Sequence, residues 1–193
     1  MNWKSFFVGA TLCVTALFST AFQAAAAEVE LKFYWVTSDN PDDPYAITGH
    51  TFKEIVEKKT GGRVLVHLFP NGVLGNERDA FEGLTMGTID MGVFVNAAVG
   101  GFVKEFQVLD LPFVFTGNEQ VDTVLDGPFG KELLKRLERA NVVGFGFAEG
   151  GFREIINKVH PINVPDDMKG VKFRVMENPI YVGMFKYLGS NPT

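Results

Sequence analysis

An alternation of strand-like and helix-like segments in the first half of the chain constrains the fold most. Residues 29–36 and 63–69 alternate apolar and polar side chains, with the period of a half-buried strand. Between them, residues 45–59 gather apolar side chains on one helical face and are followed by two glycines, a helix-stop signal. A second helix over residues 77–86 then leads to a third strand over residues 89–95. This order predicts a parallel sheet with right-handed crossovers.

The second half of the chain predicts more helices and then strands that belong to another lobe. The expected elements are helices over residues 118–126 and 128–140 and strands over residues 141–147, 152–157 and 171–175. The pair Gly150-Gly151 is a plausible hinge, because glycine gives the backbone freedom to turn from one lobe into another. We therefore expect lobe one over residues 28–150 and the start of lobe two over residues 151–193.

The first 27 residues have the features of a secretory signal peptide. Lys4 supplies a positive start, residues 6–22 are apolar, and small residues at Ala24–Ala27 suit a signal peptidase. The apolar run is short and lacks a basic stop-transfer flank, so we expect no membrane span after cleavage. The only cysteine, Cys13, lies within this run, so the mature chain would carry no thiol chemistry. The segment predicts a periplasmic protein.

Composition and spacing argue against several classes of site. The net charge of −5 and the lack of a basic cluster exclude nucleic acid as an expected partner. The three histidines are scattered without metal-ligand spacing. Asp39, Asp42 and Asp43 suggest calcium, but Pro44 stands where a calcium loop needs glycine, and an acidic helix cap explains them better. No phosphate-binding loop or nucleophile elbow is present, so we expect no metal, no cofactor and no enzyme activity.

Arg174 is the leading candidate for a ligand contact. It lies near the end of the strand predicted over residues 171–175, and Asn178-Pro179 then start a helix. A guanidinium fork beside free helix N–H groups suits a bound carboxylate, because both give charge-assisted hydrogen bonds. The alternative is that Lys172 and Arg174 form only the solvated face of an edge strand.

Four further residues are candidates, each with a structural alternative. Arg153 follows two glycines that permit close approach of a ligand, or it is a surface residue at a lobe junction. Asn96 ends a predicted strand and either donates to a ligand oxygen or caps the next turn. Glu77 could bind a ligand hydroxyl, although stabilisation of its own helix through the dipole is the favoured role. Trp35 could form a cleft wall or belong to the core.

A set of short motifs occurs in one order along almost the whole mature chain. The motifs are Gly75-Asn76-Glu77-Arg78, Gly87-Thr88-Ile89-Asp90-Met91, Leu109-Asp110-Leu111-Pro112-Phe113-Val114-Phe115, Gly151-Phe152-Arg153, Asp167-Met168-Lys169-Gly170 and Lys172-Phe173-Arg174-Val175. In this ordered set the chain resembles the extracytoplasmic solute receptors of TRAP transporters. The resemblance implies a type II periplasmic-binding-protein-like, two-lobed α/β fold. It also implies that Arg174 clamps a ligand carboxylate and that Arg153 adds a second grip.

The resemblance leads to a functional hypothesis. The protein would bind a small organic acid, close around it by a hinge motion, and deliver it to the integral membrane subunits of a TRAP transporter. Members of the resembled family continue well beyond residue 193, so we expect a C-terminally truncated chain with lobe two incomplete. The alternatives are a receptor of an ABC importer, a sensory receptor, or a secreted α/β enzyme. The sequence does not identify the acid.

Overall fold

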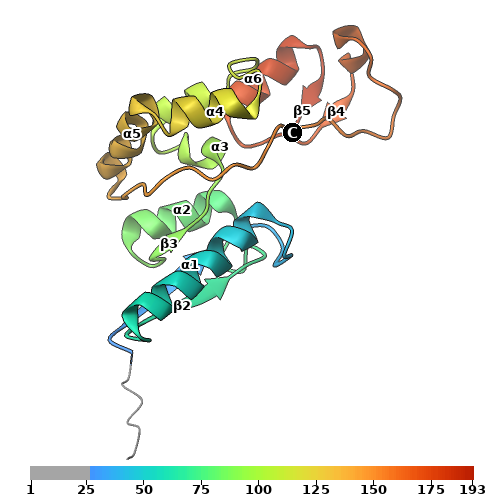
Figure 1. Ribbon diagram of the computed structural model, residues 1–193. Coiled ribbons are helices and arrows are strands. Elements are labelled where there is room, and N and C mark those ends of the chain that lie inside the picture. The colour runs from blue at the N-terminus through green and yellow to red at the C-terminus, as the bar shows by residue number, and fades with distance from the viewer. Residues whose placement is uncertain (1–26) are drawn as a thin grey trace, which may run out of the picture.

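The structure is a computed structural model that describes residues 27–193, so the predicted signal peptide and Cys13 fall outside the described residues. A lower part, residues 27–95, is built on one sheet, and an upper part, residues 96–193, carries a second and smaller sheet (Figure 1). The strands are β1 (Val29–Tyr34), β2 (Val64–Phe69), β3 (Met91–Gly92), β4 (Lys172–Phe173) and β5 (Asn191–Pro192). The α-helices are α1 (Pro44–Thr60), α2 (Glu77–Met86), α3 (Asn96–Val99), α4 (Asn118–Leu125), α5 (Pro128–Lys135) and α6 (Pro179–Tyr187). The 3₁₀ helices are η1 (Lys104–Asp110), η2 (Arg136–Ala140) and η3 (Pro165–Met168).

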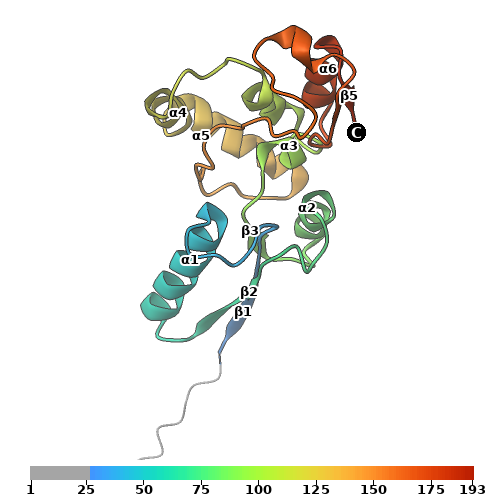
Figure 2. The same ribbon diagram turned by 90° about the vertical axis from the view of Figure 1, so that its right-hand side faces the viewer.

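The lower part confirms the predicted parallel sheet. Its strands run in the order β2-β1-β3, and both pairs are parallel. Helix α1 covers one face of this sheet and α2 covers the other (Figure 2). The period of two in β1 explains this, because Phe33 packs in the core beside α1 while Tyr34 packs with Ala80 of α2.

Helix α1 begins and ends with the signals that its sequence carries. The Asp43 carboxylate accepts hydrogen bonds from the backbone N–H groups of Tyr45 and Ala46, and Pro44 occupies the first helical position. This confirms the acidic cap as the explanation of Asp43. At the other end Gly61 adopts a left-handed conformation with φ of 60°.

The upper part begins with short helices around a second core, to which α2 of the lower part contributes Phe81. The buried residues of this core are Phe81, Val99, Val103, Phe106, Leu133, Leu137 and Val142. The helix predicted over residues 128–140 is divided into α5 and the tighter turn η2. Arg136 and Arg139 of this stretch each donate to the Glu105 carboxylate, at 2.8 Å and 2.7 Å, and so tie the end of this helical stretch to η1.

The predicted strand over residues 171–175 is shorter than expected but has the expected faces. Only Lys172–Phe173 pairs, with β5 in parallel register. Val171, Phe173 and Val175 are buried, whereas Lys172 and Arg174 are exposed. Helix α6 follows, and the Asn178 side chain caps it by accepting from the N–H of Ile180 at 2.8 Å. The cap predicted at Asn178-Pro179 is thereby confirmed.

Three other strand predictions were wrong in whole or in part. The strand expected over residues 89–95 is reduced to Met91–Gly92, and residues 141–147 and 152–157 have no regular secondary structure. A strand needs a neighbour that accepts and donates its backbone hydrogen bonds, and no described residue pairs with either of these two segments. They instead form an extended connection that runs from η2 along the upper part towards β4 (Figure 1). The lobe boundary expected at Gly150 stays a prediction.

Among residues 27–193, no helix combines the length and the apolar character needed to cross a membrane.

Candidate ligand-binding site

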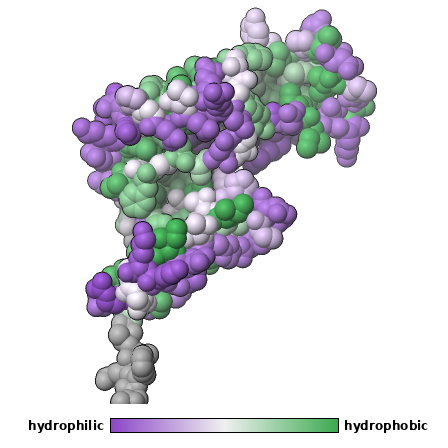
Figure 3. All heavy atoms as spheres, in the orientation of Figure 1, coloured by the Kyte–Doolittle hydropathy of each residue, from purple (hydrophilic) through white to green (hydrophobic). Residues whose placement is uncertain are grey.

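The candidate site lies where the lower and upper parts of the molecule face each other. In the space-filling view the molecule narrows to a notch between the two parts, with apolar residues exposed along it (Figure 3). Of the residues predicted from the sequence, Glu77 belongs to the lower part, whereas Arg153 and Arg174 belong to the upper part. Burial raises the pKa of the Glu77 carboxyl group, and the positive charges of Arg153 and Arg174 act in the opposite direction, which places both guanidinium groups within electrostatic reach of Glu77.

Arg174 projects from the exposed face of the strand that contains β4. It follows Phe173, whose side chain is buried, and precedes Val175, which is also buried, so the alternation aims the guanidinium away from the core. Within residues 27–193, no carboxylate forms a salt bridge with Arg174, in contrast to Arg63, Arg136 and Arg139. Its fork is thus available to a ligand oxygen.

Arg153 lies on the extended connection between η2 and β4 but is held by a helix. Its Nε–H donates to the Tyr181 hydroxyl of α6 at 3.1 Å, and its guanidinium carbon lies 5.4 Å from the centre of the Tyr181 ring. The ring face attracts the cation, so the two contacts act on the same side chain. Like Arg174, it forms no salt bridge with any described residue.

Glu77 is the first residue of α2, as predicted, and it also contacts the next segment of the chain. Its carboxylate accepts a hydrogen bond from the backbone N–H of Val95 at 2.9 Å. Burial raises the pKa of the Glu77 carboxyl group, which is the largest of the effects on it. Tyr45, at the start of α1, is close enough that the Glu77 charge helps to raise the pKa of its phenol to about 12, although burial is the main cause.

Asn96 is placed differently from the expectation, and Trp35 takes the core position that was its structural alternative. Asn96 does not end a strand, because β3 stops at Gly92 and Asn96 is the first residue of α3, whose N-cap is Val95. Its side chain makes no hydrogen bond with any other described residue. Trp35 has no exposed surface and packs at the edge of Phe33 and His50. In this conformation it has a core position and offers a ligand no surface.

A buried polar cluster beside Arg153 was missed by sequence reasoning. Asp110, at the end of η1, is 8% exposed, and Asn178 is 2% exposed. The Asn178 amide donates to Asp110 Oδ2 at 3.0 Å and to the carbonyl of Ala97 at 3.3 Å. The Tyr181 hydroxyl donates to Asp110 Oδ1 at 3.4 Å. The sequence carries one sign of this cluster: Asp110 is a single carboxylate within an apolar stretch. A carboxylate in such a position is commonly buried and hydrogen-bonded.

Burial raises the pKa of Asp110 to about 6, with the hydrogen bonds from Tyr181 and Asn178 acting in the opposite direction. The folded protein therefore holds this proton more tightly than the unfolded chain. The resulting stabilisation is present below about pH 4 and is lost as the pH rises to about 6.

Replacing Asp110 by asparagine should remove this pH dependence. In urea titrations from about pH 4 to about pH 7, the unfolding free energy of the variant relative to the wild type should rise by on the order of 3 kcal/mol. The exposed Asp126→Asn variant should follow the wild type at every pH. Parallel curves for Asp110→Asn and the wild type would contradict the raised pKa.

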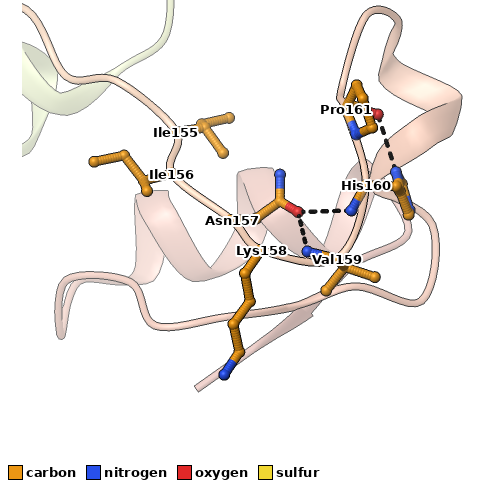
Figure 4. Close-up of a pocket in the computed structure, with 7 residues that line it drawn as sticks. All are labelled: Ile155, Ile156, Asn157, Lys158, Val159, His160 and Pro161. Atoms are coloured by element: carbon orange, nitrogen blue, oxygen red, sulfur yellow. Dashed lines mark hydrogen bonds between the residues drawn. The ribbon is translucent and has the colours of Figure 1, made fainter.

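A hollow of about 490 Å³ in the loop over residues 155–161 is a different feature (Figure 4). All of its lining comes from this one loop, which is stabilised by the Asn157 side-chain oxygen. That oxygen accepts from the backbone N–H groups of Val159 and His160, at 2.8 Å and 3.2 Å. The hollow contains none of the candidate residues. In the part of the chain that the structure describes, no group of three or more His, Cys, Asp or Glu residues is placed to hold a metal ion.

Comparison with known proteins identifies the family. Residues 36–193 match the family described as bacterial extracellular solute-binding protein, family 7. A solute-binding protein of Verminephrobacter eiseniae is 38% identical over 165 residues, which are 86% of this chain and 49% of the relative. The C4-dicarboxylate-binding periplasmic protein DctP of Rhodobacter capsulatus is 33% identical over 186 residues, which are 96% of this chain and 54% of the relative.

Solved structures agree with the sequence relatives. A TRAP periplasmic solute-binding protein from a Sulfitobacter species, with bound β-D-galacturonate, superimposes with a TM-score of 0.81 at 38% identity. The match covers 85% of this chain and 54% of that protein. A sugar acid binding protein from Advenella mimigardefordensis, in complex with galactonate, gives a TM-score of 0.81 at 37% identity, with 84% and 52% covered.

The chain spans about half the length of the curated relatives it matches. Its helices and parallel strands superimpose on TRAP periplasmic solute-binding proteins, which have a two-lobed α/β fold. This chain belongs to the bacterial extracellular solute-binding proteins of family 7, the family of the TRAP transporter receptors.

Proposed function

We propose that this protein is a periplasmic receptor that binds a small organic acid through its carboxylate and delivers it to the membrane subunits of a TRAP transporter. The observation that carries the proposal is the pair Arg153 and Arg174. Both are exposed, and neither forms a salt bridge within residues 27–193. Two unneutralised guanidinium groups in an acidic protein provide local positive charge for an anion.

In this proposal Arg174 holds the carboxylate in a bidentate pair, and Arg153 adds a second charged contact. A hydrogen bond to a charged group contributes about 1.5–3 kcal/mol, so two such bonds supply a large part of the roughly 8 kcal/mol of micromolar binding. Asn96, the first residue of α3, would add polar recognition. Ligand contacts to both lobes would stabilise a closed state reached by a hinge motion.

Glu77 favours an acid that also carries hydroxyl groups. Its carboxylate would repel a second carboxylate of the ligand but can accept a hydrogen bond from a hydroxyl. The relatives with bound galacturonate and galactonate bind acids of this kind. We therefore propose a sugar acid as the substrate class, ahead of a dicarboxylate such as the succinate bound by a Sulfurospirillum deleyianum relative.

Calorimetric titration with three matched probes tests this proposal. D-galacturonate should bind with a one-to-one stoichiometry. It should be recovered chemically unchanged, because the proposed function is binding without turnover. D-galactose, which differs by having a neutral group in place of the carboxylate, should bind at least about a hundredfold more weakly. Succinate should bind more weakly than galacturonate. Equal affinity for galacturonate and galactose would overturn carboxylate recognition.

A further inference from the structure

A series of hydrogen bonds connects the Arg153 side chain, through Tyr181, to the buried carboxylate of Asp110. The Asn178 amide and the Tyr181 hydroxyl each donate to one oxygen of Asp110, so both carboxylate oxygens are occupied. The Tyr181 oxygen in turn accepts from Nε of Arg153 at 3.1 Å. Asp110 and Tyr181 are 71 residues apart, so the arrangement exists only when η1 and α6 are packed together.

The direction of each bond is fixed by the chemistry of its groups. An ionised carboxylate only accepts, so the Tyr181 proton points to Asp110 and a lone pair of the hydroxyl faces Arg153. Arg153 is always charged and only donates, which matches that lone pair. Because Asn178 also donates to the carbonyl of Ala97, the amide that binds the Asp110 carboxylate is itself tied to α3.

This arrangement leaves the Nη1 and Nη2 groups of the Arg153 guanidinium free to bind a ligand. The Tyr181 hydroxyl accepts from Nε–H and the guanidinium carbon lies over the Tyr181 ring, whereas Nη1 and Nη2 make no hydrogen bond with any residue in the described range. These two groups form the end-on fork that binds a carboxylate with two parallel bonds. Arg153 itself lies on a connection without regular secondary structure, so its own backbone does little to fix the side chain.

We propose that Asp110 and Tyr181 are positioning residues that hold the Arg153 guanidinium with its Nη1–Nη2 fork presented to the ligand carboxylate. This inference rests on the proposed function, in which Arg153 contacts the ligand. The inference adds that the affinity for an acid depends on Asp110 and Tyr181, although neither residue contacts the ligand. The cost of ordering a long arginine side chain is met before the ligand arrives, which strengthens binding.

The Tyr181→Phe variant tests the inference, because it keeps the ring under the cation and removes only the hydroxyl. Affinity for D-galacturonate should fall roughly tenfold in calorimetry. In an Arg153→Lys background the same change should have almost no further effect, because the group that it positions is gone. The matched control is Tyr187→Phe on the same helix, which alters a tyrosine that is 92% exposed and should bind as the wild type does.

A second readout does not depend on any ligand. The NMR signal of the Arg153 Nε–H should shift and exchange faster with water in Tyr181→Phe and in Asp110→Asn, but not in Tyr187→Phe. Wild-type affinity in Tyr181→Phe, or losses that simply multiply with Arg153→Lys, would overturn the positioning role. If the wild type binds no galacturonate, the proposed function fails, and the Arg153 signal alone decides whether Tyr181 and Asp110 hold the guanidinium.

Discussion

Replacing Arg174 by lysine is expected to weaken binding of D-galacturonate by roughly tenfold to a hundredfold. Lysine keeps the positive charge but is a single ammonium group, so it cannot form the two parallel bonds of a guanidinium fork. The loss corresponds to about 1.5–3 kcal/mol, the contribution of one charge-assisted hydrogen bond. Isothermal titration calorimetry measures it directly. The exposed position of Arg174, beside the buried Phe173 and Val175, should leave folding unaffected.

A matched substitution separates loss of the fork from a general effect of lysine. Arg63 is 60% exposed, forms a surface pair with Glu28 at 3.4 Å, and is not one of the candidate ligand contacts. Arg63→Lys should bind galacturonate as the wild type does, because exposed pairs contribute little. Wild-type affinity in Arg174→Lys would remove Arg174 from the site and with it the assigned carboxylate clamp.

The Asn178→Ala variant should lose about 2–4 kcal/mol of unfolding free energy, the largest stability effect that we expect of a single polar side chain here. Asn178 is 2% exposed and serves three groups at once: the N–H of Ile180, the Asp110 carboxylate and the carbonyl of Ala97. Its removal uncaps α6 and leaves a buried carboxylate short of a donor. Urea unfolding at neutral pH, where Asp110 is ionised, measures this loss.

Asn76→Ala supplies the control for the cap alone. The Asn76 side chain caps α2 by accepting from the N–H groups of Arg78 and Asp79, and it is exposed. Its loss should cost about 1 kcal/mol, the usual effect of an N-cap. An equal cost for the two variants would mean that the contacts of Asn178 with Asp110 and Ala97 contribute nothing, which would contradict the role given to this cluster.

The parts of the fold that follow from local sequence were predictable. Helix α2 has the predicted bounds, and α1 has the predicted cap at Asp43, because caps and apolar periods depend on residues a few positions apart. The lack of regular secondary structure in residues 141–147 and 152–157 was not predictable from the sequence. They have the apolar character of strands, yet Phe145 is 79% and Ile156 is 89% exposed, since alternation says nothing about whether a partner strand is present.

The candidate site was predictable only in its charged residues. Arg153, Arg174 and Glu77 stood out because each follows a local signal: a pair of glycines, a strand end or a helix start. Asp110 and Tyr181 did not, because their roles arise from contact between segments 71 residues apart in the chain. Asn178 was predicted as a cap, but its bond to Asp110 spans 68 residues and no local pattern reports it.

A native mass spectrum of the protein isolated from cells that produce it tests the central claim most directly. We expect a complex heavier than the polypeptide by the mass of one small carboxylic acid, which is released on denaturation and which a smaller fraction of Arg174→Lys molecules carries when that variant is prepared in the same way. A wild-type protein that carries no small molecule and acquires none when incubated with D-galacturonate would contradict the claim that this chain is an organic-acid receptor.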